Sequence, residues 1–178
     1  MKLYLLRHQE RNNYNPLLYS HLTHNGIFKS NILKHILHSL NIDIIFTSPF
    51  IRCIQTITPF CNLTNLKANK EHALYEYMNF KSPIIDLEYN DTHILNDNYK
   101  SYIDIKNINH NLYDTKKRVL DFKKILLETY KNTDKNILLV THQSIINLFL
   151  EREDFNFPYG LLFDVYNIDE NKVNVINY

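Results

Sequence analysis

Short apolar runs along the chain predict strands. Lys2–Leu6 is apolar and precedes a polar segment, as a buried parallel strand does. Ile42–Thr47 has the same character, and Asn136–Thr141 is the clearest core strand in the chain. We expect a further strand within Ala68–Tyr77. These runs lie far apart in the sequence, so the segments between them decide the fold class.

Apolar residues at helical spacing predict the first two helices. From Leu22 onward one apolar stripe indicates a helix that Thr23 caps. The stripe consists of Phe28, Ile32, Ile36 and Leu40, with Leu33 and Leu37 beside it. A second helix is expected from Phe50 up to Pro59, where the proline stops or kinks it.

The second half of the chain continues the alternation. A long helix is expected to carry Val119, Phe122, Leu126 and Tyr130 on one face. A shorter helix follows over Ile145–Leu150. Two final runs, Leu161–Ile168 and Lys172–Ile176, alternate as the strands of a hairpin do. Strands and helices that alternate in this way predict an α/β fold with a largely parallel sheet.

Composition narrows the class of protein. The 178 residues, 44% hydrophobic and 22% charged, suit a single domain over 1–178, with an irregular insertion or lid at about 82–111. A net charge of +1 argues against nucleic acid as a partner. Two cysteines build neither a disulfide framework nor a zinc site, and no apolar run reaches the length that a membrane requires. We therefore expect a cytoplasmic protein that contacts no membrane.

The chemically interesting side chains follow the predicted strands directly. Arg7 and His8 come after the first strand, Ser48–Arg52 after the second, and His142 after the strongest one. Ligands of parallel sheets bind beyond the carboxyl ends of the strands. Arginine presents a planar fork of donors to phosphate oxygens, and a neutral imidazole attacks phosphorus when its other nitrogen is held. This edge of the sheet is therefore expected to bind a phosphoryl group.

Four motifs then give a family resemblance. Arg7–Glu10 resembles the Arg-His-Gly-Glu signature of the histidine phosphatase superfamily, which includes cofactor-dependent phosphoglycerate mutases. Ser48–Thr56 is similar to its Ser-Pro-x-x-Arg-x-x-Gln-Thr signature. Val140–Gln143 resembles its late strand ending in His-Gly, and Leu22–Gly26 its Leu-Thr-x-x-Gly. The resemblance implies a three-layer α/β/α sandwich around a mostly parallel sheet, like that of phosphoglycerate mutases.

The resemblance also implies residue roles. His8 would be the nucleophile that becomes phosphohistidine, while Arg7, Arg52 and His142 would hold the phosphoryl oxygens. The family's acid often lies in a Leu-x-Glu-aromatic context, which here makes Glu76 the proton donor.

Further residues are expected to belong to the same site. Glu71 is the competing acid. Substrate contacts are expected from Gln9, Arg11, Asn13, Asn15 and Gln143. The implied chemistry uses no metal and no cofactor, and its substrate is a small phosphorylated molecule or a phosphoprotein.

Two departures from the motifs keep three functions open. Gln9 and Gln143 stand where the family has glycine, which permits close backbone approach and unusual dihedral angles. We favour a phosphatase whose activity the glutamines reduce or alter. The alternatives are a phosphoglycerate mutase, for which the chain is short, and a phospho-ligand binder that has lost turnover. Substrate identity and oligomeric state stay open.

Overall fold

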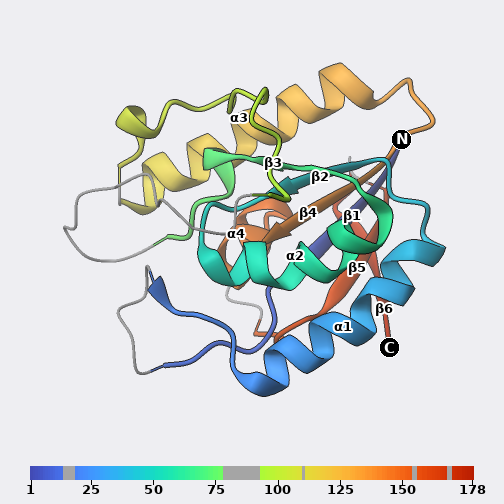
Figure 1. Ribbon diagram of the computed structural model, residues 1–178. Helices are drawn as coiled ribbons and strands as arrows, with labels where there is room; N and C mark the ends of the chain where they lie inside the picture. Colours follow the sequence, from blue (N-terminus) through green and yellow to red (C-terminus); the bar gives the residue numbers. More distant parts are fainter. Residues whose placement is uncertain (14–18, 78–92, 110, 154–155, 168–169) are drawn as a thin grey trace.

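A computed structural model describes residues 1–13, 19–77, 93–109, 111–153, 156–167 and 170–178. Within these residues six strands form one sheet in the order β3-β2-β4-β1-β5-β6 (Figure 1). The strands are β1 (Lys2–Arg7), β2 (Ile44–Thr47), β3 (Ala68–Lys70), β4 (Asn136–Thr141), β5 (Leu162–Asn167) and β6 (Lys172–Ile176). The chain order and the sheet order differ because helices carry the chain from one parallel strand to the next.

The central strands of the sheet are parallel. β4 pairs in parallel with β1 on one side, with Leu139 opposite Leu5, and with β2 on the other, with Leu139 opposite Phe46. β3 is parallel to β2, whereas β5 and β6 are antiparallel and form the predicted hairpin. The prediction of a mostly parallel sheet is therefore confirmed, and the carboxyl ends of β1, β4 and β2 lie at one edge.

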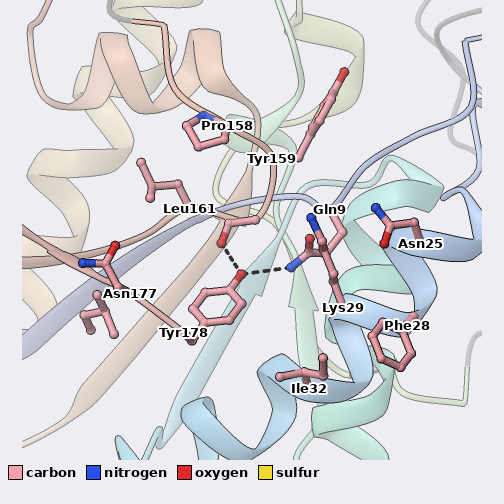
Figure 2. A pocket seen from close by; sticks show the side chains of 12 residues that line it. Gln9, Asn25, Phe28, Lys29, Ile32, Pro158, Tyr159, Leu161, Asn177 and Tyr178 are labelled. Carbon is pink, nitrogen blue, oxygen red and sulfur yellow. Dashed lines mark hydrogen bonds between the residues drawn. The ribbon is translucent and has the colours of Figure 1, made fainter.

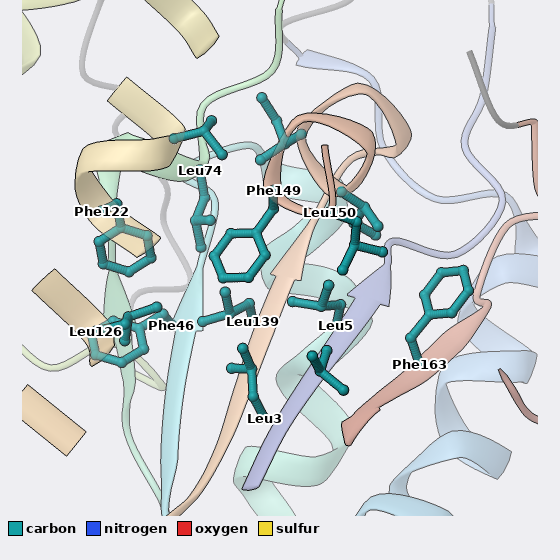
Figure 3. Close-up of a cluster of buried hydrophobic side chains, with 14 of the residues drawn as sticks. Leu3, Leu5, Phe46, Leu74, Phe122, Leu126, Leu139, Phe149, Leu150 and Phe163 are labelled. Atoms are coloured by element: carbon teal, nitrogen blue, oxygen red, sulfur yellow. The ribbon is translucent and has the colours of Figure 1, made fainter. Parts of the chain in front are cut away.

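Four described α-helices cover the two faces of the sheet: α1 (His24–Ser39), α2 (Ile51–Thr64), α3 (Leu112–Tyr130) and α4 (Gln143–Phe149). Leu5 and Leu139 point toward α3 and α4, where Phe122 and Phe149 complete one core (Figure 3). Their chain neighbours point the other way, toward α1 and α2. This alternation follows from the two-residue period of a strand and confirms the α/β/α sandwich.

The first helix is turned differently from the expectation. Thr23 caps α1 as predicted, because its side chain accepts a hydrogen bond from the Gly26 amide. The predicted stripe faces the core only in part: Phe28 is 64% exposed and Ile32 is 44% exposed, whereas Ile36 and Leu40 are half-buried and pack against the core. Leu33 and Leu37 are the buried apolar residues, together with Gly26 and Ser30. Phe28 with Ile32 and Leu33 with Leu37 are two rows that both have helical spacing. Packing against α2 buries the second row, which also contains the small residues Gly26 and Ser30.

Two further boundaries differ from the prediction. α2 continues through Pro59 to Thr64, because buried Ile57 and Phe60 on either side of the proline keep the helix packed on the sheet. The third strand ends at Lys70, and a 3₁₀ turn, η2 (His72–Leu74), follows it. The chain therefore turns off the sheet just before the segment that carries the predicted acid.

The predicted insertion at about 82–111 is described only in part. Residues 78–92 and 110 lie outside the described residues. In the remainder, Leu95 forms a parallel bridge with Ala68 at the edge of the sheet, and η3 (Ile105–Asn107) is a 3₁₀ turn. The function of this segment as a lid stays a prediction. Across the described part of the chain, every helix is too short or too polar to cross a membrane.

Gly26 supplies a test of the packing. A Cβ atom at this position would overlap the carbonyl oxygen of Glu10. We expect Gly26→Ala to lower the free energy of unfolding by about 1–3 kcal/mol, as overpacking does. Helix propensity alone would raise it by about 1 kcal/mol, so the sign decides. Urea denaturation measures the change, with Lys29→Ala at an exposed position of α1 as control. A stabilised Gly26→Ala protein would contradict the contact.

Candidate active site

The carboxyl ends of β1, β2 and β4 bring the predicted residues together. The His8 amide donates to the Thr141 carbonyl oxygen at 2.9 Å, and the Ser48 amide donates to the Val140 carbonyl oxygen at 2.9 Å. These bonds extend the sheet ladder past the ends of the strands. As a result, the His8 and His142 rings lie edge to face, with centroids 5.2 Å apart.

His8 is held in one tautomer. Its Nδ1 atom lies 2.8 Å from the backbone oxygen of Gln9, which can only accept a hydrogen bond. Burial, and then the nearby charge of Arg52, lower the pKa of His8 well below its ordinary value. The imidazole is therefore neutral, with its proton on Nδ1. The Nε2 atom keeps its lone pair, which is the electronic state of a nucleophile.

His142 is fully buried and is oriented by a hydroxyl group. Its Nε2 atom lies 2.8 Å from Ser48 Oγ, which also accepts a long hydrogen bond from the Phe50 amide at 3.4 Å. The Nδ1 atom of His142 has no hydrogen-bond partner in the described part of the chain and lies 3.6 Å from Glu76 Oε2. Burial and the charge of Arg52 also lower the pKa of His142. In the tautomer in which Ser48 donates to Nε2, the His142 proton is on Nδ1 and faces Glu76.

Arg52 and Glu76 form the charged centre of the site. Arg52 is 0% exposed, and its Nη2 atom is ion-paired with Glu76 Oε2. The guanidinium carbon also lies 4.2 Å from the centroid of the Phe50 ring. The Glu76 side chain is 23% exposed. The structure therefore places the predicted acid beside both Arg52 and His142.

Arg7 reaches the same region from the end of β1. It donates to the Phe157 carbonyl oxygen, and its guanidinium carbon lies 4.0 Å from the centroid of the Tyr159 ring. Burial lowers the pKa of Arg7. The Tyr159 ring also lies 5.5 Å from the His8 ring, centroid to centroid. Tyr159 is a site residue that sequence reasoning missed, and no pattern points to it. Ser48 belongs to the predicted segment Ser48–Arg52, but no role was predicted for its side chain.

Gln9 is built into the fold behind His8. Its backbone amide donates to Thr56 Oγ1 at 2.9 Å, and its side-chain amide donates to the Tyr178 hydroxyl at 2.9 Å (Figure 2). Tyr178 in turn donates to the Gly160 carbonyl oxygen. The Gln9 side chain thus lines a hollow of about 400 Å³ between α1 and the end of the chain. The Gln9 side chain therefore points toward this hollow and Tyr178, and none of its hydrogen bonds described here is with Arg52 or Glu76.

The remaining predicted residues are placed as follows. Gln143 is the first residue of α4 and is half-buried. Arg11 donates to Ser20 Oγ at 3.1 Å, and with Asn13 it lines a second hollow of about 450 Å³. Asn15 lies outside the described residues. Neither Gln9 nor Gln143 has a positive φ, so both backbone conformations tolerate a side chain where the family motif has glycine.

Glu71, the competing acid, is buried and hydrogen-bonded within the fold. It is 0% exposed, and its carboxylate accepts hydrogen bonds from the Ala73 amide at 2.8 Å, from Ser101 Oγ at 2.7 Å and from the Tyr102 amide at 3.0 Å. These partners fix the turn before Glu76. Over the described ranges, no cluster of three or more His, Cys, Asp or Glu side chains is arranged to hold a metal ion.

Comparisons with known proteins agree with this arrangement. The chain matches the model of the histidine phosphatase superfamily (branch 1) over residues 3–178. No curated protein matches the sequence. Among solved structures, the ecdysone phosphate phosphatase of Bombyx mori, bound to tungstate, is similar over 99% of this chain and 92% of its own, with 17% identity and a TM-score of 0.71.

Two further phosphatases of known structure are similar as well. The alpha-ribazole phosphatase of Shigella flexneri shares 18% identity over 99% of this chain and 95% of its own, with a TM-score of 0.66. The protein histidine phosphatase SixA, bound to tungstate, shares 16% identity over 100% of this chain and 95% of its own, with a TM-score of 0.61. At these identities the likeness shows a shared fold, and the substrates for which these phosphatases are named differ from one protein to the next.

The neutral histidines predict how stability depends on pH. Because the pKa of His8 is lower in the folded state, the unfolded chain binds more protons below about pH 6.5, and stability is lost as the pH falls through that window. We expect His8→Asn to remove about 1 kcal/mol of the loss that wild type shows between about pH 7.5 and about pH 5.5. Urea denaturation at both pH values measures this, with exposed His35→Asn as control. An unchanged pH dependence in His8→Asn would contradict a neutral, buried His8.

Proposed function

Because the chain belongs to the histidine phosphatase superfamily, we propose that it hydrolyses a phosphomonoester through a phosphohistidine intermediate on His8. The observation that carries this proposal is the hydrogen bond between His8 Nδ1 and the Gln9 carbonyl oxygen, which leaves Nε2 unprotonated in a ring that the charges of Arg52 and Arg7 act on. A buried, neutral imidazole fixed in this way has the state that attack on phosphorus requires.

The first half-reaction transfers the phosphoryl group to His8. The Nε2 lone pair forms a bond to phosphorus while the bond from phosphorus to the leaving oxygen breaks. Arg7 and Arg52 donate to the phosphoryl oxygens, and the inward Nδ1–H of His142 adds a third donor group. Glu76, in its protonated form, gives its proton to the leaving oxygen.

The second half-reaction releases phosphate. A water molecule attacks phosphorus, Glu76 takes the proton from that water, and the bond between His8 Nε2 and phosphorus breaks. His8 returns to its neutral state and Glu76 to its protonated state, so the atoms and protons balance. Arginine and histidine side chains stabilise the negative charge of the phosphoryl group, and Glu76 transfers the protons. We therefore propose that the reaction requires no metal and no cofactor.

The ion pair between Arg52 and Glu76 suits this cycle. Before substrate binds, Arg52 and the Glu76 carboxylate satisfy each other at the site. A phosphoryl dianion competes for Arg52 and brings negative charge beside the carboxylate, which favours the protonated form of Glu76. Substrate binding thus prepares the acid that the first half-reaction uses.

The two alternatives, mutase and inactive binder, are outcomes of the same experiment. The backbone at Gln9 and Gln143 carries no positive φ, which favours turnover over a binder that the glutamines have inactivated. The substrate is proposed to be a small phosphorylated molecule or a phosphoprotein, since similar structures include phosphatases of both kinds.

Replacement of the nucleophile tests the proposal directly. We expect His8→Ala to lower the hydrolysis of p-nitrophenyl phosphate by at least about 10³-fold, because the covalent path is lost. Wild-type activity should be unchanged by a chelator, and exposed His35→Ala should match wild type. Equal rates in His8→Ala and wild type would overturn the proposal.

The same assay separates the rival functions. A binder would release no phosphate from any substrate, yet inorganic phosphate or vanadate would raise its melting temperature. A mutase would interconvert phosphoglycerates only in the presence of the bisphosphoglycerate cofactor. Either result would replace the hydrolytic assignment.

Gln9→Gly tests whether the motif departure limits activity. Since the Gln9 side chain binds Tyr178 and its amide conformation needs no glycine, we expect kcat/KM within about threefold of wild type. We expect the free energy of unfolding to fall by about 1–2 kcal/mol, because a partly buried hydrogen bond is lost and a flexible residue is introduced. A gain of about tenfold or more in kcat/KM would show that Gln9 restrains the enzyme.

A further inference from the structure

We propose that Arg118, on α3, is a positioning residue that fixes the acid Glu76 by clamping the backbone of the turn before it. This inference rests on the proposed function, because it concerns the residue that protonates the leaving group. Arg118 lies outside every motif that pointed to the site.

Arg118 donates three hydrogen bonds to the backbone of one short segment. Its Nη1 atom donates to the carbonyl oxygens of His72 at 2.9 Å and Ala73 at 2.8 Å, and its Nη2 atom donates to the carbonyl oxygen of Tyr75 at 3.0 Å. The side chain comes from a helix more than forty residues further along the chain and is 7% exposed. One guanidinium thus binds three carbonyl groups of the segment that ends immediately before Glu76.

The segment needs such a donor because of its shape. η2 is a single 3₁₀ turn, and the carbonyl groups at the end of so short a helix have few partners within it. The remaining carbonyl, that of Leu74, accepts a hydrogen bond from Thr141 Oγ1 at 3.0 Å. Four consecutive carbonyl groups are therefore held by side chains of α3 and β4, and the backbone has little freedom left where Glu76 begins.

Glu71 holds the same turn through a backbone amide. Its carboxylate holds the Ala73 amide of the same turn and is tied to Ser101. Burial lowers the pKa of Arg118 to about 10, while the negative charge of Glu71 acts to raise it, so Arg118 keeps its charge at neutral pH. Arg118 thus binds the carbonyl groups of this turn, and Glu71 binds its Ala73 amide.

The fixed turn delivers Glu76 to the site. The Tyr75 ring packs edge to face on Phe50 at 4.7 Å between centroids, and Phe50 contacts both Arg52 and His142. Glu76 follows directly and reaches the same two residues. A misplacement on the order of 1 Å at a catalytic group costs about 10²-fold in rate, so the clamp has a measurable consequence for proton transfer.

Leaving-group dependence distinguishes positioning from plain stability. The kcat/KM value reports the first half-reaction, in which Glu76 protonates the leaving oxygen. Phenyl phosphate needs that proton, whereas p-nitrophenyl phosphate releases a stable anion without it. The ratio of the two kcat/KM values, measured on one preparation, does not depend on how much of the protein is folded.

The experiment compares Arg118→Met and Arg118→Lys with wild type and with Glu76→Gln. We expect Glu76→Gln to lower phenyl phosphate hydrolysis far more than p-nitrophenyl phosphate hydrolysis. Arg118→Met should shift the ratio in the same direction by about tenfold, and Arg118→Lys, which keeps a donor and the charge, by less. The matched control is Lys123→Met, a buried cation of the same helix that binds Glu151 at 3.2 Å and Asn171 at 2.7 Å. It should leave the ratio at the wild-type value.

The outcomes separate the two proposals. If Glu76→Gln shifts the ratio and both Arg118 variants keep the wild-type ratio, Arg118 does not position the acid. A shift of the same size in Lys123→Met would also overturn the inference, because any loss of packing on α3 would then suffice. If Glu76→Gln itself leaves the ratio unchanged, the proposed role of Glu76 fails, independently of Arg118.

Discussion

Parallel pairing of β1, β4 and β2 is the constraint on which the site depends. Because these strands run in the same direction, the residues that follow them meet at one edge of the sheet. His8, Ser48 and His142 each come within one residue of a strand end. A slip of one residue in any strand would turn its side chains to the opposite face and dismantle the cluster. The buried apolar faces on both sides of the sheet fix that register.

The charges at this edge of the sheet favour binding of an anion. Arg52 is fully buried and Arg7 partly so, while Glu76 is the acidic residue in contact with them through Arg52. Buried positive charge destabilises a protein unless a partner compensates it. The histidines avoid adding to this charge by staying neutral. A phosphoryl dianion would supply negative charge here, so burial and the arginine charges, which hold His8 unprotonated, also suit the proposed substrate.

Sequence reasoning succeeded where local pattern and chemistry coincide. Arg52 and His142 follow strands that are recognisable as apolar runs, so their meeting with His8 was predictable. The facing of α1 was not, because Phe28 and Leu33 both belong to rows with helical spacing and only packing on α2 separates them. Contacts such as that of Gln9 with Tyr178, 169 residues apart, and the clamp of Arg118 leave no trace in local pattern.

The identity of the nucleophilic atom is the sharpest point of the account. Nδ1 of His8 is hydrogen-bonded to the Gln9 carbonyl oxygen, so in the proposed mechanism the phosphoryl group attaches to Nε2. Wild-type protein mixed with excess aryl phosphate, quenched in alkali and denatured, can be examined by ³¹P NMR and mass spectrometry. The proposed mechanism predicts a single phosphohistidine at His8, phosphorylated on Nε2. A phosphoryl group on Nδ1, on another residue, or on no residue during active turnover would contradict it.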